Sequence, residues 1–173
     1  MEFITNNNPW IIGYPIHESY SLLELKAFHL ISIINASKTS NSIEDLNTLL
    51  IKEYEMSEVS RILIEIAVQI RNQIDLDCST FEGRKYNPNS STGKLTINYQ
   101  SASCRTIDLS FRESCNKIIH AKHINFDLLN PNSIKEYDYM NPQIYLYGDF
   151  NGHEWKIELD ILKFISILIC IKN

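Results

Sequence analysis

The chain has 173 residues, of which 44% are hydrophobic and 21% charged, with a formal net charge of −5. A chain of this length can bury about 70% of its unfolded surface, so we expect a single domain over residues 1–173. The acidic balance excludes the broad basic face that binding to duplex DNA requires.

Patterns for membrane insertion or export are missing. The longest apolar run, Ile161 to Ile171, falls short of the about 20 residues of a membrane span, and Lys163 interrupts it. The first ten residues, MEFITNNNPW, lack a basic region followed by an apolar run. The four cysteines form no C-x-x-C pair, so the sequence contains no zinc or redox motif of that kind. Without an export signal, a reducing compartment is the expected one. We therefore expect a cytoplasmic protein that does not contact a membrane.

The N-terminal part predicts an irregular segment followed by a helix. Residues 1–19 contain a turn-forming run of asparagines and two prolines. Ser21 and Glu24 then form a capping box, and apolar residues recur at helical spacing as far as about Ala36. This predicts a first helix from Ser21 to about Ala36.

The middle of the chain predicts a long helical region and then a loop. Residues 42–76 contain neither Gly nor Pro, which predicts one long helix or two helices that meet near Ser57. Residues 78–106 are rich in Gly, Pro, Asn and Ser, so we expect a loop in which LTINYQ, residues 95–100, forms a short strand. Another helix is expected to begin at Ser110, with Asp108 as an alternative cap.

The C-terminal part contains the clearest hairpin signal. Asn151-Gly152 separates two alternating runs, which predicts a β-hairpin over about residues 143–158, with Asp149 facing Glu154. Residues 157–171 predict a closing helix. Because strands do not otherwise alternate with helices, we expect a mainly α fold, a helical bundle of four to five helices with this one inserted β-hairpin.

The helix that begins at Ser110 carries a row of polar residues. Arg112, Asn116 and His120 follow one another at four-residue steps on the flank of its apolar face. His can transfer a proton near neutral pH, Arg can hold a phosphate, and Asn can orient a reacting group. These roles suit RNA cleavage by the 2′-hydroxyl, which needs no metal. Alternatively, Asn116 and His120 hydrogen-bond to neighbouring helices and Arg112 pairs with an acid such as Glu53 or Glu58.

A metal site is not expected at this helix. His120 and His123 form an H-x-x-H pair, but a structural zinc site needs four ligands and the sequence offers no second local pair. We therefore predict no metal and no cofactor.

The segment CNKIIHAK, within residues 109–123, resembles the motif of the HEPN family, an Arg and a polar residue such as Asn followed by His four to six residues later. Members of that family are small helical bundles, and many are metal-independent ribonucleases of toxin–antitoxin or phage-defence systems. This chain departs from the motif, because Cys115 stands where Arg would precede Asn116. Either Arg112 takes over that role, or the protein keeps the fold without the cleavage.

The resemblance implies a homodimer in which two copies of the motif line one groove. His120 would be the acid–base group, Arg112 would hold the phosphate and Asn116 would orient the reacting groups, while Lys122 and His123 would bind the RNA substrate. An antitoxin or another protein partner is also implied. The alternative function is that of a non-catalytic HEPN-like protein that binds a protein or nucleotide partner through the same surface.

Overall fold

The computed structural model describes residues 16–39, 46–75, 80–81, 84–85, 87, 89–130 and 138–169. The helices over these residues are α2 (Ile16–Thr39), α3 (Leu46–Asp75), α4 (Phe111–Ile119) and α5 (Ile161–Ile169). The strands are β1 (Thr80–Phe81), β2 (Arg84–Lys85), β3 (Ser91–Ile97), β4 (Arg105–Ser110), β5 (His123–Leu129), β6 (Tyr139–Phe150) and β7 (His153–Asp160).

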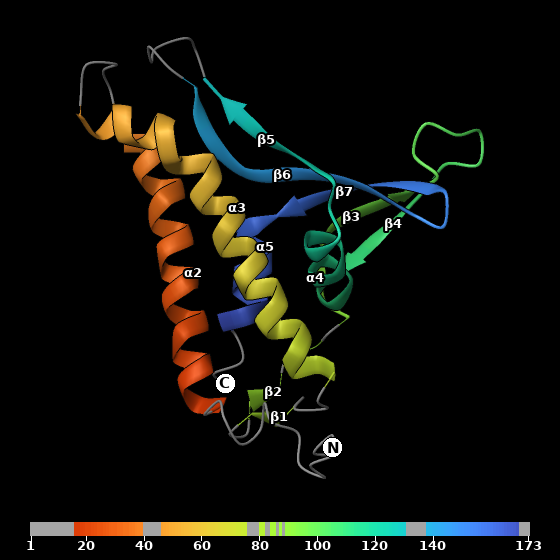
Figure 1. Ribbon diagram of the computed structural model, residues 1–173, viewed down its shortest axis with the longest axis horizontal. Helices are drawn as coiled ribbons and strands as arrows, with labels where there is room; N and C mark the ends of the chain where they lie inside the picture. Colours follow the sequence, from red (N-terminus) through yellow and green to blue (C-terminus); the bar gives the residue numbers. More distant parts are fainter. Residues whose placement is uncertain are drawn as a thin grey trace, which may run out of the picture.

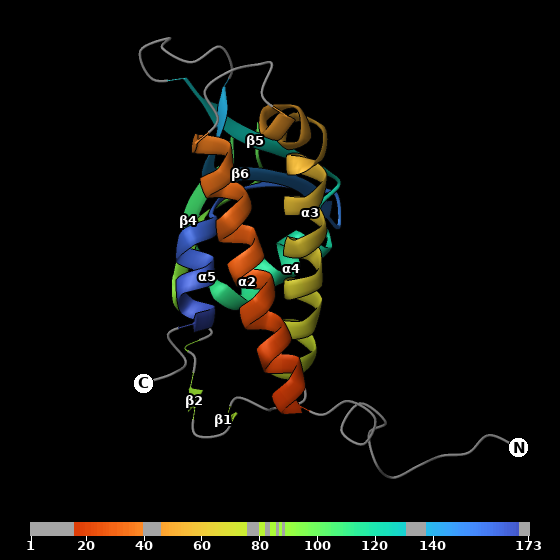
Figure 2. The same cartoon turned by 90° about the vertical axis from the view of Figure 1, so that its left-hand side faces the viewer.

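Strands β3 to β7 form one antiparallel sheet in the order β4-β3-β7-β6-β5, and β1 pairs with β2 separately. The four helices gather on one face of the five-stranded sheet (Figures 1 and 2). The described part of the chain therefore has two layers, one of helices and one of antiparallel strands.

The predicted mainly α helical bundle with one inserted hairpin is therefore wrong. The structure has β3 within the region where a loop with one short strand was expected, and β4, β5 and the first part of β6 add strands outside the expected hairpin. The physical reason lies in the side-chain alternation. Leu95 and Ile97, Ile144 and Leu146, and the buried residues of β7 point at two-residue spacing toward the helices.

Pro142 lies inside the long strand β6 and makes that strand difficult to predict from the sequence. Proline lacks the N–H that a strand donates to its neighbour, so it normally indicates a break in a strand. Strand β7 pairs with β6 only from Gln143 onward, so the segment that contains Pro142 has a neighbour on one side alone. On that side, the pairing with β5 is irregular between Phe126 and Leu128. Pro142 therefore sits where the sheet does not require its hydrogen bond.

The helices differ from the prediction mainly at their ends. Residues 46–75 form a single helix that passes Ser57 without a break. Helix α2 begins at Ile16, so residues 16–19 are helical and not irregular, while residues 1–15 lie outside the described residues. The two long helices pack through buried apolar side chains, and the Nζ of Lys26 bonds the Oε2 of Glu65 across them at 2.6 Å.

The predicted hairpin is present as two strands of the sheet. Asn151 and Gly152 have φ angles of 51° and 78°, as its two-residue turn requires, and Phe150 pairs with His153. Asp149 faces Glu154, as predicted. Strand β7 continues to Asp160, so the closing helix begins at Ile161 and not near residue 157.

Candidate functional site

A polar cavity of about 550 Å³ lies between α3, α4 and the β6–β7 hairpin. Its walls combine cations, two carboxylates and aromatic rings. The lining residues are Arg71 of α3, Glu113, Asn116 and Lys117 of α4, His120 and Lys122 after α4, and Asp149, Phe150 and Trp155 of the hairpin. We call this space the polar cavity.

Helix α4 places its polar side toward the polar cavity because its other side enters the core. Ser110 caps the helix by accepting a hydrogen bond from the N–H of Glu113, which confirms the predicted cap. Phe111, Cys115 and Ile118 are buried against the sheet and the other helices. The helix ends at Ile119, and His120 is its C-cap, with its N–H bonded to the carbonyl of Asn116 at 3.1 Å.

Glu113 organises the floor of the polar cavity. Its Oε2 accepts a hydrogen bond from the Nδ2 of Asn116 at 3.1 Å, and its Oε1 lies 3.3 Å from the Nζ of Lys117. The Lys117 ammonium also lies 4.6 Å from the centroid of the Trp155 ring. One carboxylate thus fixes both the amide and the ammonium, so the polar cavity is ordered before any ligand binds.

Lys122 and His120 occupy the rim of the polar cavity. The Nζ of Lys122 bonds the Oδ2 of Asp149, and its backbone N–H bonds the carbonyl of Tyr147 at 2.8 Å. His120 is exposed, and its imidazole makes no hydrogen bond that the structure records among the described side chains. The alternative in which His120 is satisfied by a neighbouring helix is therefore not observed.

Arg112 does not line the polar cavity, although Asn116 and His120 do. At about 100° per residue, the three α4 positions that line it, Glu113, Asn116 and Lys117, centre about 90° around the helix axis from Arg112. Arg112 is accordingly exposed. Glu113 and Lys117 lie instead on the side of the helix that faces the hairpin. Of the predicted row, the structure brings Asn116 and His120 together and leaves Arg112 outside.

Arg71 supplies the guanidinium of the polar cavity instead. No local sequence pattern separates Arg71 from Arg61, because both lie in the second half of α3, where spaced charges are typical of a solvated face. Arg61 pairs with Glu58 and Glu65 on its own helix, with contacts of 2.7 and 2.6 Å. Only the packing of α3 on α4 distinguishes the two arginines.

Cys115 lies next to this arrangement but inside the core. Burial raises the pKa of its thiol to about 12, while the nearby charge of Arg71 works in the opposite direction. A guanidinium at position 115 would enter the apolar core, where an unpaired charge is strongly disfavoured. Arg71 instead approaches the same part of α4 from the neighbouring helix.

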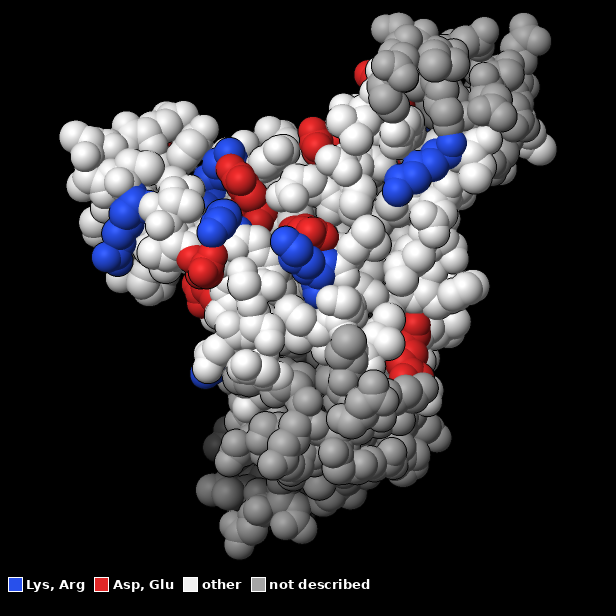
Figure 3. Space-filling view, turned by 180° about the vertical axis from the view of Figure 1, so that it is seen from behind, with Lys and Arg blue, Asp and Glu red and all other residues white. Residues whose placement is uncertain are grey.

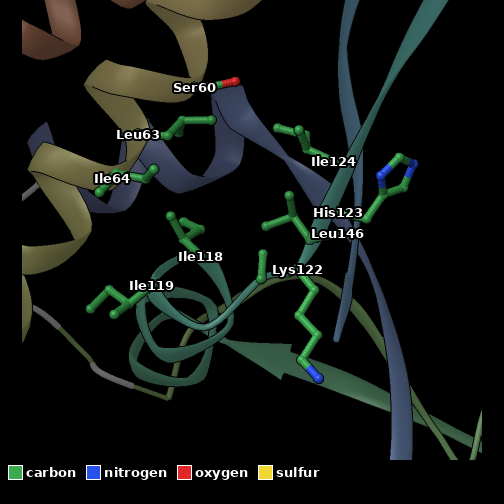
Figure 4. A pocket seen from close by; sticks show the side chains of 10 residues that line it. Ser60, Leu63, Ile64, Ile118, Ile119, Lys122, His123, Ile124 and Leu146 are labelled. Carbon is green, nitrogen blue, oxygen red and sulfur yellow. The ribbon is translucent and has the colours of Figure 1, made fainter. Parts of the chain in front are cut away.

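The two predicted substrate-binding residues, Lys122 and His123, are adjacent where β5 begins, but only one of them lines the polar cavity. Lys122 lines the polar cavity, whereas His123 pairs with Tyr147 on the outward face of the sheet, where the two rings lie 6.0 Å apart. Figure 4 shows the His123 ring pointing away from the helices. The two residues differ in this way because α4 ends at Ile119 and the chain enters β5 at His123.

A second, apolar cavity of about 260 Å³ lies beside the end of α4 (Figure 4). Its walls are mostly apolar: Leu63 and Ile64 of α3, Ile118 and Ile119 of α4, Ala121, Ile124 of β5 and Leu146 of β6. Ser60, Lys122 and His123 complete the lining. Its walls offer few polar groups to orient a ligand, so it is a weaker candidate for chemistry than the polar cavity.

Compared with known proteins, the chain matches no family model, no curated protein and no solved structure.

Among the side chains that the structure describes, no three His, Cys, Asp or Glu residues lie close enough together to hold a metal ion. Over the same part of the chain, no helix combines the length and apolar character that crossing a membrane requires.

Proposed function

We propose that the polar cavity binds a phosphate of an RNA strand and that the protein cleaves RNA without a metal ion. The observation that carries the proposal is that Arg71, Asn116 and His120, from two helices, line one cavity. These are the charge-stabilising, orienting and proton-transferring groups that the reaction needs. Arg71 takes the role that the sequence suggested for Arg112.

The proposed reaction uses the RNA's own 2′-hydroxyl as the nucleophile. His120 accepts the 2′-hydroxyl proton while the 2′ oxygen bonds to phosphorus. The bond from phosphorus to the 5′ oxygen breaks, that oxygen takes a proton from water, and the His120 imidazolium gives its proton to the hydroxide that is left. Arg71 stabilises the charge that develops on the phosphate oxygens, and Asn116, held by Glu113, orients the reacting groups. The products carry a 2′,3′-cyclic phosphate and a 5′-hydroxyl.

The substrate is a single strand and not a duplex. On the face shown in Figure 3, acidic and basic side chains lie beside one another and form no continuous basic surface among the described residues. A chain with a net charge of −5 offers duplex nucleic acid little general attraction. A local cavity with several cations suits one flexible strand instead.

Membership of the HEPN family stays a prediction, and the proposal no longer uses the bundle that the resemblance implied. It stands on the polar cavity alone. We keep the cytoplasm as the proposed location, since both cysteines that the structure describes, Cys104 and Cys115, are free thiols.

The test is RNA cleavage by the purified protein in excess EDTA, with analysis of the product ends. We expect His120→Ala to lower the rate by about 100-fold or more, and Arg71→Ala to lower it by a similar factor. Arg112→Ala is the matched control, because it removes the same charge from outside the polar cavity, and it should cleave like the wild type. If the wild type does not cleave RNA, or if His120→Ala cleaves it at the wild-type rate, the proposal is contradicted.

The second candidate is a non-catalytic protein that acts through an interaction surface, with a second copy of the chain as the partner. Exposed apolar side chains along α3 favour it, namely Leu46, Leu49, Leu50, Ile64 and Val68. Sedimentation equilibrium should then show a dimer that Leu50→Glu converts to monomer. A wild-type protein that is monomeric at all concentrations would exclude this homodimer.

A further inference from the structure

A third cavity, of about 370 Å³, adjoins the polar cavity on the far side of the hairpin tip. The two cavities share four lining residues, Glu113, Lys117, Phe150 and Trp155. The third cavity adds Asn98 and Arg105 from the β3–β4 region and His153 from β7. We call the joined space the hairpin groove.

The charge of the hairpin groove differs from that of the whole chain. Although the protein carries a net charge of −5, four lining residues are basic and only two are acidic. The basic residues are Arg71, Arg105, Lys117 and Lys122, and the acidic ones are Glu113 and Asp149. Because Arg71 and Arg105 belong to different cavities, the groove has a guanidinium toward each end. This arrangement suits an extended ligand with more than one anionic group.

Aromatic rings lie between the two ends of the hairpin groove. Phe150 lines both cavities and is 69% exposed, which is unusual for a phenyl ring in a polar turn. Trp155 is buried and also lines both cavities. An exposed aromatic ring in a groove that is lined by cations provides a stacking surface for an unpaired base.

The outer end of the groove is held in a defined shape. The Nδ1 of His153 lies 2.8 Å from the Oδ1 of Asn98, which connects the hairpin to the end of β3. The backbone N–H of Tyr99 also bonds the carbonyl of Glu154 at 3.1 Å. These two contacts fix β7 against the β3–β4 loop beside Arg105. The shape of the third cavity is therefore set by the backbone and by the His153–Asn98 contact, and not only by the exposed side chain of Phe150.

We propose that the hairpin groove holds two successive nucleotides of single-stranded RNA, with one phosphate near Arg71, the next near Arg105 and a base stacked on Phe150. The inference takes its ligand class from the proposed function and adds the path of the strand. The protein therefore recognises a strand of at least two nucleotides and binds a single nucleotide more weakly.

The test measures binding of a 2′-O-methyl tetranucleotide, which has no free 2′-hydroxyl and cannot be cleaved by the proposed route. We expect Phe150→Ala to weaken binding about tenfold, as loss of one stacked base implies. Arg105→Ala should weaken it and lower the slope of log affinity against log salt by about one. Arg105→Ala should leave binding of a 3′-mononucleotide unchanged, whereas Arg71→Ala should weaken both ligands.

Two matched controls separate this path from general effects. Phe28→Ala removes a ring of similar exposure, 64%, from α2, and Arg112→Ala removes an exposed charge outside the groove. Both should bind the tetranucleotide like the wild type. If the wild type does not bind it, or if Phe150→Ala and Arg105→Ala both bind it as the wild type does, the inferred path is overturned.

The path and the cleavage can fail independently of each other. If the methylated strand binds through Phe150 and Arg105 but RNA is not cleaved, the proposed cleavage falls and the path stands. If RNA is cleaved with dependence on His120 while both variants bind normally, the path falls and the cleavage stands.

Discussion

The ammonium of Lys122 bonds the carboxylate of Asp149, which joins the segment after α4 to the β6–β7 hairpin at the rim of the polar cavity. Asp149 also faces Glu154 across the two strands. Two like charges in this position destabilise a hairpin, and the nearby cation offsets their repulsion. The ion pair therefore explains how the hairpin tolerates the facing carboxylates.

We expect Lys122→Ala to lower the free energy of unfolding by about 0.5–1 kcal/mol, since the pair is exposed and its loss also leaves the two carboxylates uncompensated. Urea denaturation at low salt measures this. The double variant Lys122→Ala/Asp149→Asn should recover part of the loss, because it removes the repulsion as well. In about 1 M salt the effect should shrink, since screening acts on exposed charges. An equal loss at both salt concentrations would contradict the electrostatic explanation.

His120→Ala should leave the stability nearly unchanged. The side chain is exposed and has no recorded hydrogen bond within the described part of the chain, so we expect a Tm within about 2 °C of the wild type. Thermal unfolding followed by circular dichroism checks this. Cys115→Asp, which places a charge in the core beside the same helix, provides a destabilised comparison. A large drop in Tm for His120→Ala would show that the imidazole has a structural role.

Gly148 is required because the Trp155 ring lies across it. A Cβ on residue 148 would approach the Cζ2 atom of Trp155 to 2.2 Å, and that ring is 4% exposed and cannot move into solvent freely. We expect Gly148→Ala to lower the free energy of unfolding by about 1–3 kcal/mol. Chemical denaturation measures the loss.

The smaller ring of Trp155→Phe should relieve this clash. In a double-mutant cycle, Gly148→Ala should therefore cost less in the Trp155→Phe background than in the wild type. Additive losses would mean that the clash does not involve the indole.

The buried thiol of Cys115 should make stability depend on alkaline pH. Its pKa is raised from about 9 to about 12, so the folded state keeps the proton after the unfolded state has lost it. The stability from this group is thus complete below pH of about 9 and falls as the pH rises toward 12. Denaturation midpoints at pH of about 8 and about 10.5 should move less in Cys115→Ala than in the wild type.

Thiol labelling gives an independent measurement of the same difference. Cys104 is exposed and should react with a thiol reagent in the native protein at pH of about 8, whereas Cys115 should react only after unfolding. Mass spectrometry of the labelled peptides distinguishes the two sites. Rapid labelling of native Cys115 would contradict its burial.

The sequence determined those features that depend on local chemistry. The Asn151-Gly152 turn and the Ser110 cap follow from backbone preferences of a few adjacent residues, and both are present. The helical character of residues 46–75 follows likewise from a long stretch without Gly or Pro, whereas only the structure shows that they form one helix and not two. For the same reason, the spacing alone could place Asn116 on a helix and His120 one turn further along the chain, where the structure has its C-cap.

Only the tertiary structure decided the sheet and the position of the arginine in the candidate site. Short alternating runs such as β4 become strands when distant runs pair with them and the helices cover one face, which is information outside any local window. Arg71 and Arg112 are equivalent as residue types, and the packing of α3 on α4 beneath the hairpin brings Arg71 and not Arg112 to His120. The sequence therefore identified one helix of the candidate site, and its partner helix became visible only through packing.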